Sequence, residues 1–369
     1  IPLRLVGSEM CIRDRYYTPQ LLAGAYSEYR TRAYNTRSFI YAWDPSDNHL
    51  PAGFRYLDLP SALLQDGNYG DQGLYLLDDT RLTNDYSGNH LIASAYAAAN
   101  LPFGRFNVFA GVRFEHSRMT LESNLSDYER RTAKRHYEGN DFFPSLNTVW
   151  KVNERHQLRL SYGRSINRPE FREISTSVFY DFDLASNVQG NTELKACHVD
   201  NFDLRYEWYP SRGDQITVAG FYKSFDAPIE WSYTVTGGTD VVYSFVNAKR
   251  AYSLGIEVDI RKNLAFMGMK DFTLVFNGSA IKSRVNFSEG SRQKDRPMQG
   301  QSPYLVNLGL FYAHDIWNAS LQYNRIGKRL IGVGRNLGST GDQTVNIPDS
   351  YDCLLYTSPS PRDVEESRM

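Results

Sequence analysis

Residues 201–208 read Asn-Phe-Asp-Leu-Arg-Tyr-Glu-Trp, and this octapeptide decides the fold class. Apolar side chains occupy every second position, and the positions between them are polar or charged. Because successive side chains of a β-strand point to opposite faces, this alternation predicts a strand with one apolar and one polar face. The same pattern recurs with different residues in four further stretches, 254–260, 272–280, 306–312 and 317–323.

The apolar faces of these stretches carry no charge. The opposite faces do, and their charged residues are Asp203, Arg205, Glu207, Glu257 and Asp259. A charge that faces lipid costs about 2–4 kcal/mol at the middle of a bilayer, so a transmembrane barrel requires such segregation. A soluble β-sandwich shows the same alternation with its apolar face turned inward, so alternation alone leaves both architectures open.

The lengths of the connections favour the barrel. Short connections are expected near 100–105, 153–156, 210–214, 263–271 and 313–316. Long ones fall between them, near 122–141, 168–197, 227–240 and 287–302. Tight turns that alternate with long loops are typical of an up-and-down membrane barrel. We predict about ten strands from 88 to 333 and one earlier strand near 20–40, followed by a long loop at 42–87 with a short helix at 59–64.

Aromatic residues flank the short connections, namely Phe106, Trp150, Trp208, Tyr209 and Trp317. Tyrosine and tryptophan favour the boundary between lipid and water, so these residues predict an interfacial aromatic belt at the short-turn end. Aromatic residues at strand ends also plug soluble barrels, and this alternative stays open.

Bulk properties exclude two classes of protein. The 369 residues suffice for one large all-β domain or two average ones, and no apolar run approaches the roughly 18 residues of a transmembrane helix. A helical membrane protein is therefore excluded. The net charge of -1 gives no global field that would favour nucleic acid as a partner.

We expect no catalytic, cofactor-binding or metal-binding site. The chain has no phosphate-binding Gly-x-x-x-x-Gly-Lys-Ser/Thr loop, no His-Glu-x-x-His and no Gly-x-Ser-x-Gly. The glycines at 332, 334 and 338 have the wrong spacing for a dinucleotide fingerprint, and no pair among the seven histidines has metal-ligand spacing.

Two groups of charged residues are candidate contacts. Arg130, Arg131 and Arg135 form a basic cluster, together with Lys134 and His136, in a predicted long loop. This cluster is either simply solvated or meets anionic lipopolysaccharide or an anionic ligand.

The second group, Glu28, Arg30 and Arg32, shares one face of the first predicted strand. These residues either line the lumen and contact a further domain or a ligand, or form inter-strand ion pairs along the polar wall. Arg168 opens a long loop, and we interpret it as structural, with ligand contact as the alternative.

Two glycines on polar faces, Gly255 and Gly309, indicate positions where a missing side chain lets another group approach closely.

The two ends read differently from the rest. The runs LVGSEMCIRDR (5–15) and DCLLYTSPSPRD (352–363) resemble translated sequencing-adapter sequence. We therefore divide the chain into 1–15 and 352–369, both non-native, and a natural portion, 16–351. Ordinary disordered tails are the alternative. On the adapter interpretation Cys11 and Cys353 are not biological, and Cys197 alone remains.

Several motifs of the natural portion resemble the barrel of TonB-dependent receptors in the style of the Bacteroidota. They are INRPEF (166–171), GNTELK (190–195), YSFVNAKRAYSLGIEVDIR (243–261), RPMQGQSPYLVNLGLFY (296–312) and YNRIGKRLIGVG (323–334). The resemblance covers nearly all of 16–351.

The resemblance implies an antiparallel, up-and-down transmembrane β-barrel of 22 strands in the outer membrane of a Gram-negative bacterium, of which about 11 are represented here. It further implies a separate N-terminal plug domain, the TonB energy-transducing complex, and outer-membrane lipid and lipopolysaccharide as partners. The implied activity is energised uptake of a scarce ligand: an iron–siderophore complex, a vitamin or a glycan. A passive porin-like barrel and a soluble β-rich binding domain are the alternatives.

Overall fold

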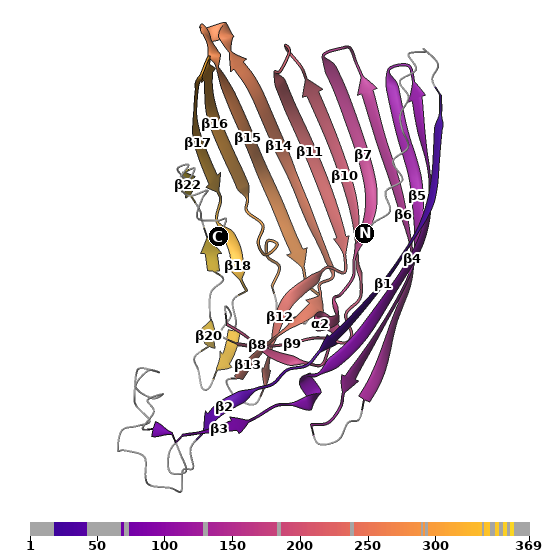
Figure 1. Ribbon diagram of the computed structural model, residues 1–369, viewed down its shortest axis with the longest axis vertical. Coiled ribbons are helices and arrows are strands. Elements are labelled where there is room, and N and C mark those ends of the chain that lie inside the picture. The colour runs from indigo at the N-terminus through magenta and orange to yellow at the C-terminus, as the bar shows by residue number, and fades with distance from the viewer. Residues whose placement is uncertain are drawn as a thin grey trace.

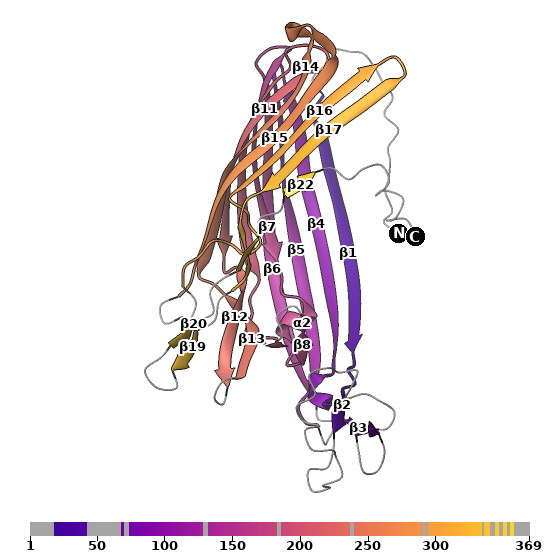
Figure 2. The ribbon, with the colours of Figure 1, turned by 90° about the vertical axis from the view of Figure 1, so that its left-hand side faces the viewer.

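A computed structural model describes residues 18–42, 68–69, 74–127, 132–182, 186–236, 240–288, 291, 294–333, 336–339, 344–346, 350–352 and 355–357. Its main element is an antiparallel sheet in the order β1-β4-β5-β6-β7-β10-β11-β14-β15-β16-β17-β22. The sheet curves into an open trough (Figures 1 and 2). An all-β antiparallel architecture is therefore confirmed.

Eleven of these strands are long, as the sequence predicts. They are β1 (Gln20–Tyr34), β4 (Tyr86–Phe103), β5 (Phe106–Asn124), β6 (Thr132–Lys151), β7 (His156–Asn167), β10 (Cys197–Trp208), β11 (Gln215–Asp226), β14 (Arg250–Leu264), β15 (Met269–Asn286), β16 (Tyr304–His314) and β17 (Trp317–Ile326). The twelfth, β22 (Leu355–Thr357), pairs with three residues of β17. The interpretation of 352–369 as non-native stays a prediction, and the segment 1–15 lies outside the described residues.

Short turns all lie at one end of the trough, the upper end in Figure 1. They follow β4, β6, β10, β14 and β16, and the 3₁₀ helix η4 (Ala265–Met267) forms one of them. Gly104 and Gly268 take positive φ values of 57° and 82° in two of these turns, a conformation that costs glycine nothing. The predicted phase of short and long connections is thus observed.

The long connections at the other end contain regular structure of their own. The first holds β2 (Phe39–Ala42), β3 (Tyr75–Asp78) and the 3₁₀ helix η3 (Leu82–Asn84). The segment between β7 and β10 holds helix α2 (Phe171–Ile174), β8 (Val178–Asp181) and β9 (Ser186–Gln189). Between β11 and β14 lies the hairpin of β12 (Ile229–Thr236) and β13 (Asp240–Asn247). After β17 come β18 (Arg329–Gly332), β19 (Asn336–Ser339), β20 (Thr344–Asn346) and β21 (Ser350–Asp352).

One predicted loop is wrong. We expect a long connection near 122–141, but β5 continues to Asn124 and β6 starts at Thr132. Both sides of this part of the hairpin are polar, so the apolar alternation disappears although the backbone ladder continues, with Asn124 opposite Thr132. The predicted helix at 59–64 lies outside the described residues.

The apolar faces of the strands join into one continuous outer surface. Register places Phe202 opposite Tyr162 and Tyr222, Tyr222 opposite Leu254, and so on across the sheet. Large side chains on this surface are exposed to a degree unusual in a soluble protein: Leu204 is 49% exposed, Ile256 59% and Leu321 73%. An apolar patch of this extent indicates contact with lipid or with another protein.

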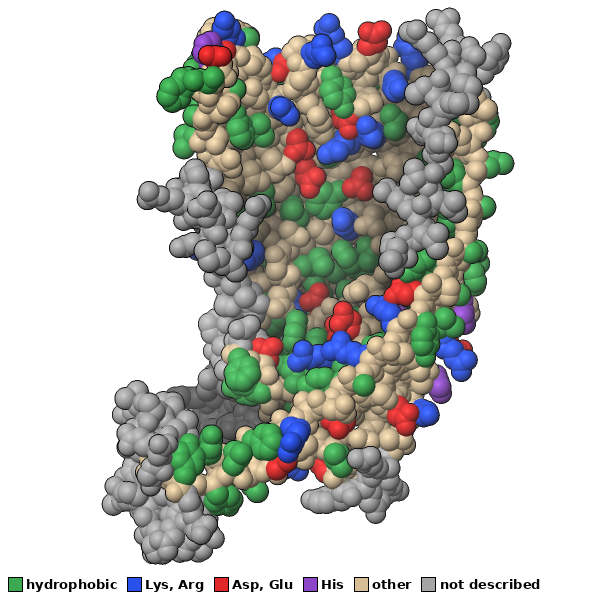
Figure 3. Space-filling view, in the orientation of Figure 1, with side chains coloured by type: hydrophobic (Ala, Val, Ile, Leu, Met, Phe, Trp, Pro, Cys, Tyr) green, Lys and Arg blue, Asp and Glu red, His purple; other side chains and the backbone are tan. Residues whose placement is uncertain are grey.

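Charged residues lie on the opposite, hollowed face (Figure 3). Ion pairs link its strands, with Arg159 Nε 3.0 Å from Glu207 Oε1 and Arg205 Nη2 3.6 Å from Asp259 Oδ2. The close approach predicted at two glycines is also found here. A Cβ at Gly255 would lie 2.7 Å from the ring of Phe221, and one at Gly309 would lie 2.8 Å from the ring of Phe311.

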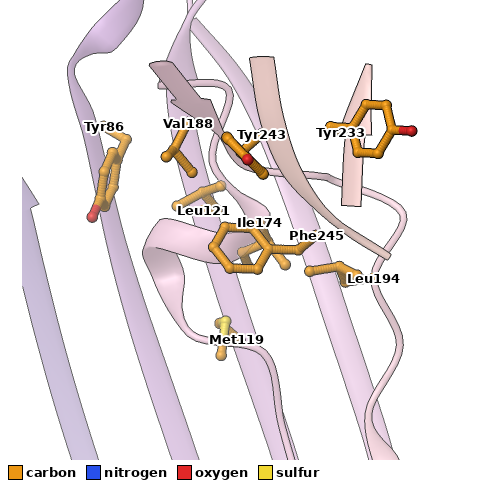
Figure 4. Packing of buried hydrophobic residues seen from close by; sticks show 9 residues of the cluster. All are labelled: Tyr86, Met119, Leu121, Ile174, Val188, Leu194, Tyr233, Tyr243 and Phe245. Carbon is orange, nitrogen blue, oxygen red and sulfur yellow. The ribbon is translucent and has the colours of Figure 1, made fainter. Parts of the chain in front are cut away.

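The buried hydrophobic core lies between the inner wall and the long connections, not within the sheet (Figure 4). Tyr86, Met119 and Leu121 extend from the wall, and they pack against residues of the connections: Ile174, Val188, Leu194, Tyr233, Tyr243 and Phe245. Complete burial of a large apolar side chain stabilises a fold by about 1.5–3 kcal/mol, so this contact holds the connections firmly inside the trough. Within the described residues, we find no helix with the length and apolar character needed to cross a bilayer.

Candidate functional site

A cavity of 350 Å³ opens on the inner wall, near the end that carries the long connections. We call it the lumenal cavity. Its polar and aromatic lining comes from β1, β4 and the segment that follows β7, and comprises Arg30, Arg32, His90, Arg168, Glu170 and Phe171. Three residues singled out from the sequence, two on β1 and one more than 130 positions away, are thus brought together.

Strand geometry places the β1 residues on this wall. Arg30 lies opposite His90 and Arg32 opposite Gly88 on β4, so alternate β1 side chains enter the trough. Arg30 Nε is 2.7 Å from Glu28 Oε1, and Arg30 Nη2 is 3.4 Å from His90 Nδ1. Glu28 and Arg30 therefore pair along one strand, whereas the sequence-based alternative was an inter-strand pair.

Arg168 is the centre of a largely buried charge network. Its Nη1 lies 2.5 Å from Glu115 Oε1, and its Nη2 donates a hydrogen bond of 3.0 Å to Asp141 Oδ2. Asp141 Oδ1 is 2.8 Å from His198 Nε2, and Arg113 also contacts Glu115. The side chain of Arg168 is 17% exposed and that of Glu115 is 5% exposed. This guanidinium contacts β5 and β6 directly and is linked to β10 through Asp141 and His198, in keeping with the structural interpretation of Arg168.

Little in the sequence indicates a role for Glu115, Asp141 and His198. Their strands show no motif, and the three residues meet because Glu115 lies opposite Asp141 in the β5–β6 register. Glu115 lies outside the five stretches for which alternation was predicted, and alternation cannot show which basic residue of a later connection reaches it.

Helix α2 forms the floor of the cavity. Glu170 and Glu173 make a capping box at its N-terminus, in which each side chain accepts a backbone N–H of the other residue. Phe171, the first residue of the helix, packs against Gly88 of β4, where a Cβ would lie 2.5 Å from the ring. The INRPEF motif (166–171) therefore contains, in order, the end of strand β7, the largely buried Arg168 and the first residue of helix α2.

The predicted basic cluster is divided by the structure. Arg130 and Arg131 lie outside the described residues. Arg135 and Lys134 lie on β6 and point to opposite faces: Arg135 Nη1 is 3.0 Å from Glu193 Oε1 inside the trough, and Lys134 Nζ is 3.3 Å from Glu122 Oε2 outside. The segment therefore does not form one continuous basic surface.

Four of the five aromatic residues expected at the short-turn end lie on the outer surface. Phe106 stacks on Trp150 with ring centroids 5.6 Å apart, Trp208 stacks on His156 at 5.8 Å, and Trp317 is 70% exposed. Tyr209 differs, because its hydroxyl donates a hydrogen bond of 2.7 Å to Glu207 on the inner face.

A second aromatic row, not foreseen from the sequence, crosses the outer surface nearer the long connections. Phe114 packs on Phe142 at 5.0 Å. Tyr162, Phe202 and Tyr222 follow at 4.9 and 6.5 Å, with Tyr162 opposite Leu146 and therefore nearer the short turns than Phe142. About eight residues of β5 separate Phe106 from Phe114, roughly 26 Å at 3.3 Å per residue. Strands of a membrane barrel are tilted by about 35–45°, so this length corresponds to a height of roughly 20 Å, somewhat less than the apolar band of about 25 Å that lies between two aromatic girdles.

Two of the three guanidinium groups in the cavity, those of Arg30 and Arg168, are held in fixed positions by carboxylate and imidazole partners. No nucleophile–base pair lies among the residues quoted for the cavity. Within the part of the chain that the structure describes, no group of three or more His, Cys, Asp or Glu side chains could hold a metal ion.

Comparison with known proteins identifies the architecture. The family model "TonB dependent receptor-like, beta-barrel" matches residues 11–351. No curated protein sequence matches the chain. Among solved structures, the copper transporter OprC aligns with a TM-score of 0.57 and 12% identity, covering 92% of this chain and 46% of that one. The ferric-catecholate import receptor Fiu from K12 E. coli aligns with a TM-score of 0.56 and 13% identity, covering 92% and 45%.

At these identities the likeness shows the fold alone, and the chain spans about half the length of the structures that it matches. The match of the family model over most of the sequence shows more than the fold. The eleven long strands, the alternating connections and this match together establish that the chain belongs to the TonB-dependent receptor family and forms part of its β-barrel.

Proposed function

We propose that the chain is part of an outer-membrane receptor of a Gram-negative bacterium that imports a scarce ligand with energy from the TonB complex. The observation that carries this proposal is the combination of an apolar outer surface between two aromatic rows with a charged inner wall that contains a cavity. Lipid explains the outer surface, and a ligand or plug that passes through the lumen explains the inner one.

The partners follow from family membership. A plug domain would fill the lumen and contact the wall, and the TonB complex would act on the plug from the periplasm. We propose that Glu28, Arg30 and Arg32 contact the plug or the ligand, because two of them line the lumenal cavity and the third pairs with Arg30. The aromatic rows would lie at the two membrane interfaces, and we propose that Lys134, on the outer face beyond the second row, contacts lipopolysaccharide.

The cargo is an iron–siderophore complex, a vitamin or a glycan. Solved structures with the same fold include a ferric-catecholate import receptor and a copper transporter, so the fold itself is compatible with different cargoes. We propose transport without an enzymatic step, because the family consists of transport receptors. The Bacteroidota style of the motifs and the total of 22 strands stay predictions.

Uptake measurements in cells with and without TonB test the proposal. The full-length reading frame would be expressed in a host, and cells would be given a ferric siderophore, cyanocobalamin or an oligosaccharide, each radiolabelled. We expect one probe to accumulate only when both the receptor and TonB are present. Accumulation that needs the receptor but not TonB would indicate a passive porin-like barrel, and recovery of the protein without detergent would indicate a soluble domain.

A double variant addresses the cavity directly. Arg30→Ala with Arg32→Ala removes two guanidinium groups from the cavity, whereas Arg118→Ala removes one on the outer face, where Arg118 Nε pairs with Glu138 at 3.1 Å. We expect the double variant to reduce TonB-dependent uptake while the Arg118 variant retains it. Equal uptake by both variants would show that the cavity takes no part in transport.

A further inference from the structure

The described parts of 171–195 and 229–247 fold together inside the trough, and we call this unit the sill. It contains α2, β8, β9, β12 and β13, and four of these form one small sheet in the order β12-β13-β9-β8. Figure 1 shows the sill across the lower part of the trough, and Figure 4 shows its side chains against the wall. Two connections far apart in sequence thus form one body.

The two halves of the sill are joined by side chains of the GNTELK and VNAKR motifs. Asn191 joins the two halves through its side chain, because its Nδ2 donates a hydrogen bond of 2.9 Å to Phe245 O. Its backbone N–H donates a hydrogen bond of 2.6 Å to Glu173 O within the first half. Asn247 exchanges hydrogen bonds of 2.8 and 2.9 Å with the backbone of Lys195. These side chains therefore connect the two halves by hydrogen bonds to backbone groups, one of them part-buried and the others exposed.

Gly190 makes the closest contact within the sill. A Cβ at this position would lie 2.7 Å from Arg172 O and 2.8 Å from Glu173 O, which are both backbone atoms at the end of α2. Backbone cannot rotate away as a flexible side chain can, so glycine is required for the β9 end to pack on the helix.

The sill is attached to the wall by apolar and polar contacts. Met119 and Leu121 of β5, both at least nine-tenths buried, pack under Ile174 and Val188. Tyr137 of β6 donates a hydrogen bond of 2.9 Å to Thr192 O. The Val178 amide donates one of 2.9 Å to Asn84 Oδ1 of η3, in the connection that leads into β4.

A third connection, the one between β15 and β16, also contacts the sill. Glu230 of β12 lies 2.9 Å from Arg296 of the β15–β16 connection, and the two side chains are 8% and 6% exposed. A paired charge at this depth opposes movement, because displacement of one partner leaves the other buried and uncompensated.

We infer that the sill is a fixed constriction of the lumen and not a lid that opens during transport. An opening movement would expose the shared hydrophobic core to water. It would also leave the polar groups described above without their partners. The inference rests on the proposed transport function, because helix α2 of the sill forms one side of the lumenal cavity. If the sill is fixed, α2 holds this position before a ligand binds. Gating is then left to elements other than the sill.

Spin-label distances in the full-length receptor test this inference without a cargo. One label would replace Asn187, exposed on β9, and the other Arg118, exposed on the outer face of β5. In outer membranes, with and without an energised TonB system, we expect one narrow distance distribution that does not change. A second population that appears on energisation would overturn the inference, whereas a failure of the transport proposal would appear in uptake and leave this distribution as it is.

Protease accessibility in intact cells supplies a second measurement. Lys195 is exposed at the end of GNTELK, and a fixed sill protects the peptide bond that follows it. We expect Gly190→Ala to speed tryptic cleavage there by at least roughly tenfold, the factor that corresponds to about 1.4 kcal/mol. Gly163→Ala is the matched control, because a Cβ on β7 would meet nothing within 4 Å.

Should Gly190→Ala fail to reach the membrane, Gly88→Ala perturbs the same attachment from the wall side, where Phe171 packs. Cleavage at Lys195 that is equally fast in the wild type and in both sill variants would contradict a fixed constriction.

Discussion

Arg168 shows how one side chain can hold several strands of a barrel wall. Its guanidinium contacts Glu115 on β5 and Asp141 on β6, and it follows the end of β7 directly. Arginine suits this role, because its planar group presents donors in two directions at once. The residue type and its place after a strand were visible in the sequence, but its acidic partners were not.

Arg168→Ala should destabilise the receptor by about 3 kcal/mol, because it leaves two buried carboxylates without their shared partner. Arg118→Ala, which breaks the exposed pair with Glu138, should change stability by less than about 1 kcal/mol. Urea unfolding of the detergent-solubilised receptor, followed by tryptophan fluorescence, would compare them. Equal effects of the two substitutions would refute the central position of Arg168.

A second prediction at the residue scale concerns pH. Asp214 lies in the β10–β11 turn, where Lys262 Nζ is 2.5 Å from Oδ2 and the Asn263 amide donates to Oδ1 at 2.9 Å. Burial alone would raise the pKa of this carboxyl, but hydrogen bonds from Asn263, Lys262 and Ser211 outweigh it and lower the pKa from 3.8 to about 2. The stabilisation is therefore complete above the unfolded value and is lost as the pH falls from 3.8 through about 2.

Thermal unfolding of the receptor between pH 7 and pH 2 measures this effect. Asp214→Asn should lower Tm at neutral pH and flatten its decline below pH 4, whereas Asp315→Asn, at an exposed position in the β16–β17 turn, should follow the wild type. An unchanged acid slope in the Asp214 variant would show that another group is responsible.

At the scale of elements, the strands were predictable because lipid on one side and water on the other impose alternation on each of them. Strands β10 and β14–β17 follow this rule, and the sequence predicts them all. The lower halves of β5 and β6 extend beyond the second aromatic row, where the outer face is polar and inner-face residues such as Met119 and Leu121 meet the sill, so no lipid-facing apolar stripe marks the strands there. The hairpin of β12 and β13 escaped prediction for the opposite reason, since both its faces meet protein.

Glycine positions within the strands give an element-scale prediction. Gly255→Val would place its side chain against the ring of Phe221 and the carbonyl of Ala280, whereas the nearest atom to a Cβ at Gly220 is 3.9 Å away. We expect Gly255→Val to destabilise the β11–β14 pair by about 1–3 kcal/mol and Gly220→Val to have little effect. Heat-modifiable migration on gels reports the loss, and a larger effect at Gly220 would contradict the assigned faces.

Substitutions at two neighbouring residues of β10 test the assignment of the outer and inner faces. Leu204→Arg puts a charge on the outer surface and should cost about 2–4 kcal/mol, and it should reduce insertion into the membrane. Asp203→Arg changes the adjacent residue, whose side chain faces the hollow, and should insert normally. The amount of folded receptor in purified outer membranes measures both, and equal losses would argue against a lipid-facing outer surface.

At the scale of the whole molecule, the sequence indicated an open array of eleven strands with all short turns at one end, and the structure confirms this. The sequence did not indicate the sill. Apolar residues such as Ile174 and Val188 show that a connection is buried, but not that its core is shared with the inside of a barrel wall. The lumenal cavity was also only partly predictable. Its arginines could be named from the sequence, but their proximity depends on how the sill folds against β4 and β5.

The central claim is that the surface formed by Phe202, Leu204, Tyr206 and Trp208 faces lipid, and a spin-label scan of β10 in outer membranes tests it most directly. Labels placed singly at 201–208 would be examined for collision with oxygen, which concentrates in lipid, and with a water-soluble nickel chelate. We predict a period of two, with oxygen maxima at the four apolar positions and nickel maxima at Asp203 and Arg205. The reverse phase, or nickel accessibility at all positions, would contradict the membrane barrel.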